Sequence, residues 1–154
     1  MEQTLVIFKP CTIQRGLFGQ ITDRFERKGL LLAGIKMLWL TDSILDDHYS
    51  HLKDKPFFGR IKASMEISPV IVMCWEGIEA VSVVRNLVGP TNGREAQSGT
   101  IRGDFSMSVQ ENIIHASDSL ESAAIELKRF FEPHELFKYE MLLLSNLYAS
   151  DEIV

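Results

Sequence analysis

Several features that mark large classes of protein are scarce or absent in this sequence. Only Cys11 and Cys74 occur among its 154 residues, which argues against a disulfide-stapled scaffold and favours a reducing compartment. No apolar run reaches the length of about 18 residues that a membrane-spanning helix needs. Residues 1–4 lack the basic start and the cleavage site of a signal peptide. We therefore expect a cytoplasmic protein.

An excess of basic residues is also missing. Sixteen lysines and arginines face 21 aspartates and glutamates, and the formal net charge is -5 at pH 7. This balance argues against a general electrostatic hold on nucleic acid or on an anionic membrane. With 45% hydrophobic and 24% charged residues, the composition is that of a globular protein. A chain of this length can bury about 70% of its unfolded surface, and we expect a single domain over residues 1–154.

Two kinds of segment alternate along the chain. Short apolar runs predict strands at residues 4–8, 30–40, 69–75 and 112–115. Apolar residues at helical spacing predict helices over residues 17–28, 43–52, 58–65, 80–88 and 118–131. This order favours an α+β fold, the ferredoxin-like βαββαβ arrangement with a four-stranded antiparallel sheet and an added helical hairpin. A C-terminal tail begins at Pro133, and we expect its apolar residues 141–148 to pack onto the body.

Two helix starts and one long irregular segment can also be located. Ser43 with Asp46 resembles a capping box, and Asp118 with Glu121 marks the start of the last helix. Residues 89–111 show no period and are interrupted by glycines. Loops of that length in compact domains are usually functional or disordered.

His115 stands where the last predicted strand meets the last predicted helix. In a strand, Ile114 points to the face opposite Ile113 and His115, so His115 lies outside the core if Ile114 lies in it. A histidine among apolar residues is, on its own, more often structural than catalytic. Whether His115 is structural or catalytic therefore depends on the motifs around it.

Three cationic residues occur at the edges of separate predicted elements. Lys9 follows the first strand, Arg85 lies on the helix that ends beside the long loop, and Arg102 stands between two glycines in "GTIRGD". Each alone is better explained as a surface charge. Together, in an acidic chain, they are what a phosphate-binding cleft requires. The G-x-x-x-x-G-K-[ST] motif of a P-loop does not occur.

Two adjacent aromatic residues, Phe57 and Phe58, follow a proline turn in "KPFF". We expect one of them to belong to the core. The other could be an exposed platform for stacking, and the spacing leaves this open.

Five motifs in order resemble those of nucleoside diphosphate kinases, and the likeness extends from about residue 3 to about residue 131. They are "FKPCTIQRG" at 8–16, "HYSHLKDKPFF" at 48–58, "GPTNG" at 89–93, "GTIRGDFS" at 99–106 and "NIIHASDS" at 112–119. The resemblance implies a ping-pong reaction in which a nucleoside triphosphate phosphorylates His115 and a diphosphate then takes the group. An imidazole suits this role, because it is a competent nucleophile near pH 7 and its phosphoramidate stays reactive.

The same resemblance assigns roles to individual residues. Glu126 would orient the His115 ring, Ser117 would lie close to it, and Tyr49 would position Lys9 or the phosphate. The implied catalytic residues are His115, Lys9, Tyr49, Asn112, Ser117 and Glu126. The implied nucleotide-binding residues are Lys9, Phe57, Arg85, Thr91, Arg102 and Asn112, with Phe57 stacking on the base and Lys9 and Asn112 reaching the sugar.

Partners also follow from the resemblance. Mg²⁺ would be carried on the nucleotide phosphates without a dedicated protein site, and Asp118 is explained as a helix cap. Base stacking discriminates weakly, so we expect tolerance of different bases and of ribose and deoxyribose. Relatives are homo-oligomers, tetramers or hexamers built from dimers. Cys11-Thr12, Gly93-Arg94, Ser98 and Ala116 depart from the usual family residues, and the change at Gly93-Arg94 affects a loop used in subunit contacts.

Two alternatives belong to other classes of function. A non-catalytic interaction protein on the same scaffold is possible, but the joint presence of His115, Lys9, Arg85, Arg102 and Asn112 argues against it. A ferredoxin-like RNA-binding module would need an aromatic-rich strand signature, which is absent, and a net charge of the opposite sign.

Overall fold

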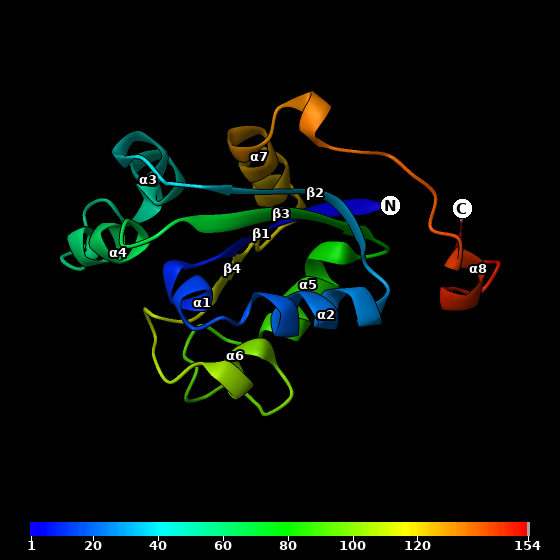
Figure 1. The fold of residues 1–154 in the computed structure, drawn as a ribbon, viewed down its shortest axis with the longest axis horizontal. Helices are drawn as coiled ribbons and strands as arrows, with labels where there is room; N and C mark the ends of the chain where they lie inside the picture. The colour runs from blue at the N-terminus through cyan, green and yellow to red at the C-terminus, as the bar shows by residue number, and fades with distance from the viewer. Residues whose placement is uncertain (154) are drawn as a thin grey trace.

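Four apolar segments of the chain form one antiparallel sheet. A computed structural model, which describes residues 1–153, places the strands in the order β2-β3-β1-β4 (Figure 1). Their bounds are β1 Glu2–Phe8, β2 Leu31–Leu38, β3 Val70–Gly77 and β4 Ile114–Ala116. The central strands β1 and β3 are buried on both faces, as their continuous apolar runs predict. The predicted α+β, ferredoxin-like class is confirmed.

Helices cover both faces of this sheet (Figure 1). One face packs against α1 (Pro10–Gln14), α2 (Phe18–Lys28), α5 (Ala80–Val88) and α6 (Ile101–Phe105). The other packs against α3 (Asp42–His48), α4 (Phe58–Met65) and α7 (Leu120–Phe130). Short 3₁₀ turns lie at Ser50–Leu52 and Pro133–Glu135, and a one-turn helix, α8, spans Leu144–Leu147. The predicted helical hairpin between β2 and β3 is therefore α3 and α4.

The side chains of β1 divide the core into two layers. Val6 and Phe8 point to the α2 and α5 side, whereas Leu5 and Ile7 point to the α3, α4 and α7 side. This is the alternation of a strand that is buried on both faces. Because β4 pairs with β1, the position of each β4 side chain is fixed by its partner on β1.

Two predicted helix starts are wrong. α3 is capped by Thr41, whose hydroxyl accepts from the Ile44 amide at 3.3 Å, and Ser43 lies inside the helix. α7 is capped by Ser119, which accepts from the Ser122 amide at 3.0 Å, and not by Asp118. In both cases the capping residue has the extended backbone that a cap requires, and its hydroxyl accepts from the amide three residues on.

The long segment 89–111 also contains a helix that the sequence pattern does not predict. Helix α6 begins at Thr100, whose hydroxyl accepts from the Gly103 amide at 3.0 Å. A side chain at position 103 would place its Cβ 1.9 Å from the Gln97 carbonyl oxygen, so only glycine fits. Helices of five residues, such as α6 and α1, are too short to show a helical period.

Only some of the apolar residues of α7 face the core. Ala123, Leu127 and Phe130 are buried, whereas Leu120 and Ala124 are exposed. Phe131 follows the last helical residue and is buried. The half-buried Glu126 lies on the same side of α7 as Ala123 and Leu127.

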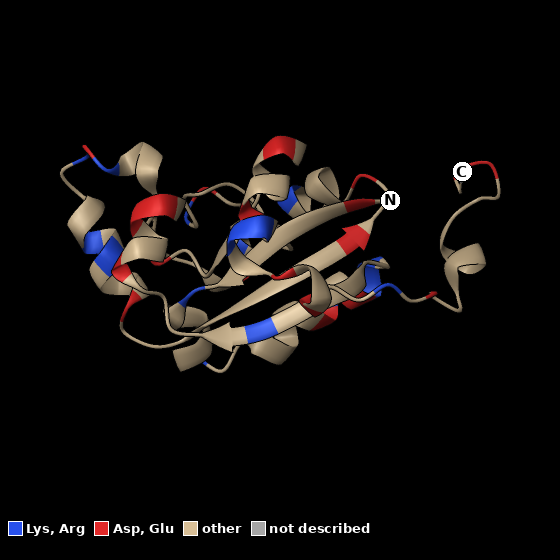
Figure 2. Cartoon of the chain, turned by 90° about the horizontal axis from the view of Figure 1, so that it is seen from above, with Lys and Arg blue, Asp and Glu red and all other residues tan. Residues whose placement is uncertain are grey.

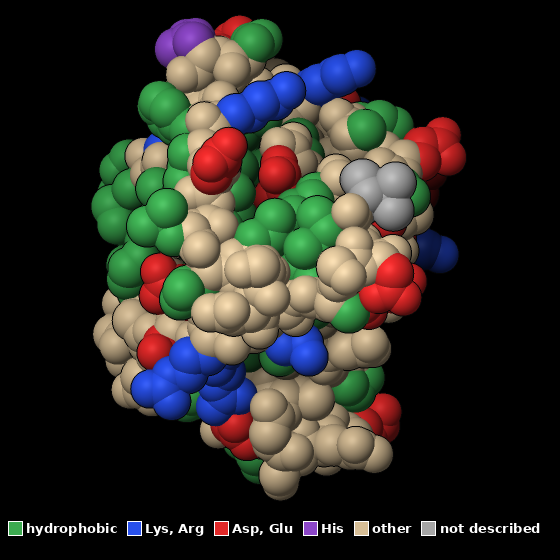
Figure 3. Space-filling view, turned by 90° about the vertical axis from the view of Figure 1, so that its right-hand side faces the viewer, with side chains coloured by type: hydrophobic (Ala, Val, Ile, Leu, Met, Phe, Trp, Pro, Cys, Tyr) green, Lys and Arg blue, Asp and Glu red, His purple; other side chains and the backbone are tan. Residues whose placement is uncertain are grey.

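The C-terminal tail packs onto the body only in part. Its backbone crosses β2 at Ala33, where a bulge leaves a carbonyl free to accept from the Phe137 amide at 2.8 Å. Farther along, the Tyr148 hydroxyl lies 3.4 Å from the Ile78 amide. Met141, Leu144 and Tyr148 are half-buried, whereas Leu142 is 93% exposed, so the expected packing of residues 141–148 holds only for part of that segment. Figure 3 shows apolar side chains gathered on this side of the molecule.

Charged residues of both signs are interspersed over the helices, strands and loops (Figure 2). Cys11 and Cys74 are both free thiols, and Cys74 is buried. Within residues 1–153, no helix combines the length and apolar character needed to cross a membrane.

Candidate active site

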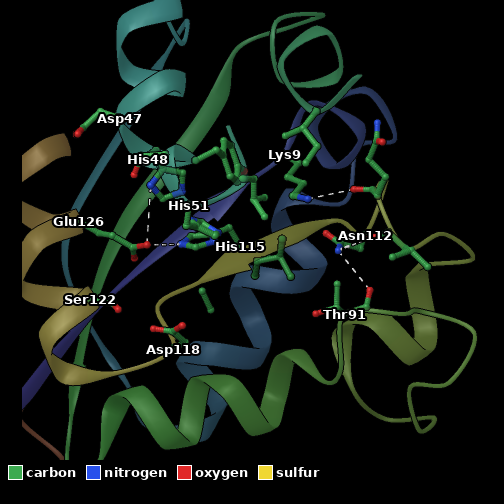
Figure 4. A pocket seen from close by; sticks show the side chains of 18 of the residues that line it. Lys9, Asp47, His48, His51, Thr91, Asn112, His115, Asp118, Ser122 and Glu126 are labelled. Carbon is green, nitrogen blue, oxygen red and sulfur yellow. Dashed lines mark hydrogen bonds and ion pairs between the residues drawn. The ribbon is translucent and has the colours of Figure 1, made fainter. Parts of the chain in front are cut away.

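A cavity of about 940 Å³ opens where β1 ends beside β4, between the α3–α4 hairpin and the segment before β4 (Figure 4). Residues far apart in the sequence meet at its wall. The site residues implied by the resemblance that line it are Lys9, Tyr49, Phe57, Arg85, Thr91, Arg102, Asn112, His115 and Glu126. Ser117 is fully buried behind them.

His115 reaches this cavity because of its place in β4. It pairs with Ile7 of β1, and the flanking Ile114 and Ala116 are buried on the opposite face. The predicted opposition of Ile114 and His115 is confirmed, but that of Ile113 and Ile114 is wrong. Ile113 has a φ of 75°, precedes the strand and packs into the same core cluster as Ile114. A left-handed backbone at a β-branched residue is strained, and such strain concentrates at functional sites.

One edge of the His115 ring is held by Glu126, which α7 brings over the sheet. The Nε2 atom lies 3.0 Å from the Glu126 Oε1 atom, and the Ser117 hydroxyl donates to Oε2 at 2.5 Å. Burial raises the pKa of the Glu126 carboxyl, but the hydrogen bonds from His115 and Ser117 outweigh it and hold the pKa below its usual value. Glu126 is therefore a carboxylate at neutral pH, and it fixes the proton of neutral His115 on Nε2.

His48, at the C-terminal end of α3, was missed by sequence reasoning. Its side chain is 1% exposed and its ring stands edge to face with that of His115, with 4.6 Å between the centroids. Burial, followed by repulsion from His115, lowers the pKa of His48 to about 3. A signal was present, because His48 follows the buried Leu45 by three residues and so lies on the inner face of the helix.

Lys9 directly follows β1, and its backbone amide donates to the Ile113 carbonyl at 3.0 Å. Its ammonium group donates to the Gln110 carbonyl at 3.1 Å. Burial and the neighbouring Arg102 guanidinium lower the pKa of Lys9 to about 8. A bound polyanion would relieve this repulsion between like charges.

Arg102 is not the solvated surface arginine that its loop position allows, because it is only 4% exposed. Its guanidinium donates to the carbonyls of Gly89, Asn112 and Ile114 at 2.9, 3.1 and 2.6 Å. These bonds tie the segment after α5 to the start of β4. Burial and the nearby Arg85 lower the pKa of Arg102 to about 10, so the group stays charged at neutral pH. Two of its five N–H donors remain for a ligand.

Besides the Nε2 atom of His48, two buried polar atoms at the cavity wall have no partner within residues 1–153. The amide nitrogen of Asn112 donates to Thr91 and Val109, which leaves its Oδ1 as a free acceptor. The Tyr49 hydroxyl has no hydrogen bond either, so it does not hold Lys9. Burial raises the pKa of Tyr49, and the group remains a neutral donor. Unpaired buried polar groups are costly, and a polar ligand would satisfy both.

The two aromatic residues of "KPFF" divide as expected. Phe58, the first residue of α4, packs against the core, and Phe57 lines the cavity with part of its side chain exposed. Arg85 is half-buried on α5 and Thr91 is exposed in the loop that follows. A base could lie on Phe57 while its phosphates face the cations.

A resident metal ion does not suit this cavity. Of the His, Cys, Asp and Glu side chains in residues 1–153, His48, His115 and Glu126 form the one cluster close enough for shared ligation, with ligand atoms within 4.8 Å. However, the Nη1 atom of Arg129 lies 3.2 Å from the His48 Nδ1 atom. A cation there would be repelled by the guanidinium group, and the His48 Nδ1 atom already accepts a hydrogen bond from Arg129.

Comparison with known proteins agrees with the motifs. A model of the nucleoside diphosphate kinase family matches residues 2–136. The chain is similar to the nucleoside diphosphate kinase of Parabacteroides distasonis, with 68% identity over 152 residues and 99% of each chain covered. It is also similar to nucleoside diphosphate kinase A of Mus musculus, with 44% identity over 96% of this chain and 97% of the mouse protein.

Solved structures agree as well. A nucleoside diphosphate kinase from Halobacterium salinarum, in complex with CDP, superimposes with a TM-score of 0.93 at 37% identity, covering 96% of this chain and 98% of that one. A family protein from Babesia bovis gives a TM-score of 0.92 at 44% identity, covering 96% of this chain and 100% of that one.

Proposed function

Because the chain belongs to the nucleoside diphosphate kinase family and acts on nucleotides as a phosphotransferase, we propose that His115 carries the phosphoryl group between them. The atom that accepts the group is Nδ1. The observation that supports this choice is the 3.0 Å contact between His115 Nε2 and Glu126, which leaves Nδ1 as the ring nitrogen with a free lone pair.

The ring-side contacts suit the charge changes of this step. As Nδ1 attacks the γ-phosphorus, the ring becomes positively charged, and the Glu126 carboxylate beside Nε2 stabilises that charge. No proton has to leave the ring at Nδ1, because the neutral tautomer already presents its lone pair there. The diphosphate leaves, and an acceptor diphosphate attacks the same phosphorus in the second half-reaction.

The cavity supplies what a phosphate chain needs. Phosphoryl transfer depends on alignment and on donors that neutralise the phosphate oxygens. Lys9, Arg85, Arg102 and Thr91 would provide these donors, and the free Oδ1 of Asn112 would accept from a sugar hydroxyl. The relative from Halobacterium salinarum is described in complex with CDP, which supports a nucleotide in this place.

Family membership implies a divalent metal ion that accompanies the nucleotide, and we propose Mg²⁺ as part of the substrate. We also propose broad tolerance of bases and of ribose and deoxyribose. Phe57 offers a face on which any base can stack, and such stacking is weakly selective.

Labelling with γ-³²P-ATP and Mg²⁺ tests the phosphohistidine. The wild-type protein should take up label that is lost in acid and kept in alkali, and His115→Ala should take up none. His134→Ala, in the exposed turn after α7, is the matched control and should label like the wild type. Unlabelled wild type, or an equally labelled His115→Ala variant, would contradict the proposal. Addition of GDP to the labelled protein should then move the label to GTP.

We propose that the protein is a homo-oligomer built from dimers through the edge of β2, beyond Ala33, where the tail crosses it. Ile35, Met37 and Trp39 recur at every second residue and are 45%, 57% and 58% exposed. An exposed apolar edge strand is a site for pairing with another chain. Met37→Glu should shift the sedimentation coefficient toward the monomer, whereas Ile67→Glu, at an equally exposed isoleucine, should not. Tetramer and hexamer are both compatible with such a dimer.

A cytoplasmic location and a single domain over residues 1–154 are further proposals. Two free thiols support a reducing compartment. Both core clusters draw on the same central strands, which supports a single unit. Val154 lies outside the described residues.

A further inference from the structure

His48 lies beside His115, the proposed phosphate carrier, but it is not among the predicted site residues. Its ring is enclosed by Tyr49, His115 and Phe130, with centroid separations of 4.7, 4.6 and 5.4 Å. Packing alone would be satisfied by phenylalanine, which has a similar shape and no polar atoms. A buried imidazole needs a separate explanation, because burial of a polar group is costly unless it forms hydrogen bonds.

The partner of His48 is Arg129 on α7. The Nη1 atom of Arg129 lies 3.2 Å from the His48 Nδ1 atom, and its Nε atom pairs with the Asp47 carboxylate. A guanidinium group can only donate hydrogen bonds. The His48 Nδ1 atom is therefore the acceptor, and the ring is neutral with its proton on Nε2.

Arg129 has a second anionic neighbour that it does not contact. Glu126 precedes it by three residues on α7, and residues at this spacing lie side by side and commonly form ion pairs. Among the ion pairs in residues 1–153, Arg129 is paired with Asp47, and Glu126 is paired with the two histidines. The expected pair on the helix surface is not formed.

The His48 ring stands between these two charges. Its Nδ1 atom is 3.2 Å from the Arg129 guanidinium and 3.9 Å from the Glu126 Oε1 atom. If the acceptor were lost, the Arg129 Nη1 atom would need a new one. Asp47 already accepts from Nε, and the other carboxylate beside the His48 ring is Glu126, which holds His115 Nε2. A charged pair is stronger than the hydrogen bond between a carboxylate and a neutral imidazole, so Glu126 would turn away from His115.

We propose that His48 is a positioning residue that accepts from Arg129 and thereby keeps Glu126 on the Nε2 atom of His115. The inference rests on the proposed role of His115 as phosphate carrier. The acceptor function at Nδ1 is what matters, and the aromatic shape of the ring is secondary. Asp47 contributes from the surface, because it holds the other side of the same guanidinium group.

Two substitutions at position 48 separate acceptor from shape. His48→Phe keeps the ring and removes the acceptor, and it should slow single-turnover phosphorylation of His115 by about 10- to 100-fold, as misplaced supporting groups do. The Kd for ATP should change little, because the nucleotide contacts are untouched. His48→Asn places an amide oxygen near Nδ1 and should retain a rate within about threefold of wild type. Equal rates for wild type and His48→Phe would overturn the inference.

A double variant tests the competition directly. When His48→Phe is combined with Arg129→Gln, the competing charge is removed, and the rate should recover by about tenfold over His48→Phe alone. Arg129→Gln alone should cost less than His48→Phe. Arg27→Gln, which removes the arginine of an exposed ion pair on α2, is the matched control and should leave every rate unchanged. A double variant as slow as His48→Phe, with unfolding midpoints that match, would show that only packing matters.

The tautomer of His115 gives a readout that a purely structural role would not move. In ¹H–¹⁵N spectra, the wild type and His48→Asn should show the ring proton on Nε2, and His48→Phe should show a mixture of both tautomers. If wild-type protein takes up no phosphate, the proposed function fails. If the wild type is phosphorylated and His48→Phe keeps the pure Nε2–H tautomer, only this inference fails.

Discussion

The polar groups on the two sides of the His115 ring differ in how many of them have hydrogen-bond partners. On the Nε2 side, both oxygens of Glu126 accept hydrogen bonds, from His115 and from Ser117. On the Nδ1 side, the Tyr49 hydroxyl and the Asn112 Oδ1 atom are buried without partners, and Lys9 has its pKa lowered to about 8. The hydrogen bonds on the Nε2 side are already formed in the free protein, whereas the groups on the Nδ1 side are left to bind a ligand.

In the proposed reaction, the Nε2 side therefore orients the His115 ring, and the Nδ1 side binds the nucleotide. Contacts that are already formed hold the nucleophile in place and cost nothing further when the substrate arrives. Contacts that are left unformed cost stability in the free protein, and nucleotide binding recovers that cost. Substitutions on the Nε2 side should therefore change the rate of phosphorylation, and substitutions on the Nδ1 side should change nucleotide binding as well.

The largest effect is expected on the ligand side, at Lys9. Lys9→Met removes a cation that faces the phosphates, and kcat/KM should fall by about 100- to 1,000-fold. The variant should at the same time be no less stable to urea than the wild type, because the burial of the ammonium group and its repulsion by Arg102 are relieved. A variant with unchanged kcat/KM would remove Lys9 from the phosphate site.

On the ring side, Glu126→Gln should slow single-turnover phosphorylation by about 100-fold. The amide keeps the shape but lacks the charge that stabilises the ring as it becomes cationic. ATP affinity, measured by calorimetry, should stay within about threefold of wild type, because Glu126 faces the ring edge away from the phosphates. Loss of affinity without loss of rate would reverse the assignment of the two sides.

The buried His48 should make stability depend on pH. Its pKa is about 3 in the folded protein against an ordinary value of 6.5, so between these values the unfolded chain binds more protons. Stability should be full above pH 6.5 and should fall as pH drops below it, by on the order of 1 kcal/mol per pH unit. Urea unfolding at pH 7 and pH 5 measures this. In His48→Asn the dependence should be clearly weaker; an identical slope would rule out His48 as its source.

The smallest and sharpest contrast compares two hydroxyl groups. Tyr49→Phe removes an unpartnered hydroxyl, so the free protein should be as stable as wild type while nucleotide affinity falls. Ser117→Ala removes a donor to Glu126, so stability should fall by about 1 kcal/mol while affinity is kept. Thermal unfolding with and without ADP measures both. The same response in both variants would mean that the two sides do not differ.

Much of the fold is readable from the sequence because long periodic segments carry strong signals. The four strands and helices α2, α4 and α5 follow from apolar spacing. α6 does not, since a five-residue helix set by Thr100 and Gly103 depends on local hydrogen bonds and on close approach to Gln97. The sequence cannot place the cap of α7 to the residue, because Asp118 and Ser119 are both good caps. Only the backbone conformation shows that Ser119 is the one that caps the helix.

The site shows the same limit. Spacing placed His115 at the end of a strand, and the motifs drew attention to the residues around it. Spacing could not show that Ile113 leaves the strand conformation, or that Arg102 is buried among carbonyl groups. The role of His48 depends on contact with residues 67 and 81 positions away in the chain, and only the fold creates those contacts.

The nitrogen that bears the phosphate is the most direct test of the account. Phosphorylated protein with ¹⁵N-labelled histidine can be examined for coupling between ³¹P and the ring nitrogens of His115. The account predicts phosphorus on Nδ1 and a proton on Nε2 that remains hydrogen-bonded to Glu126. Phosphorus on Nε2, or on another residue, would contradict it.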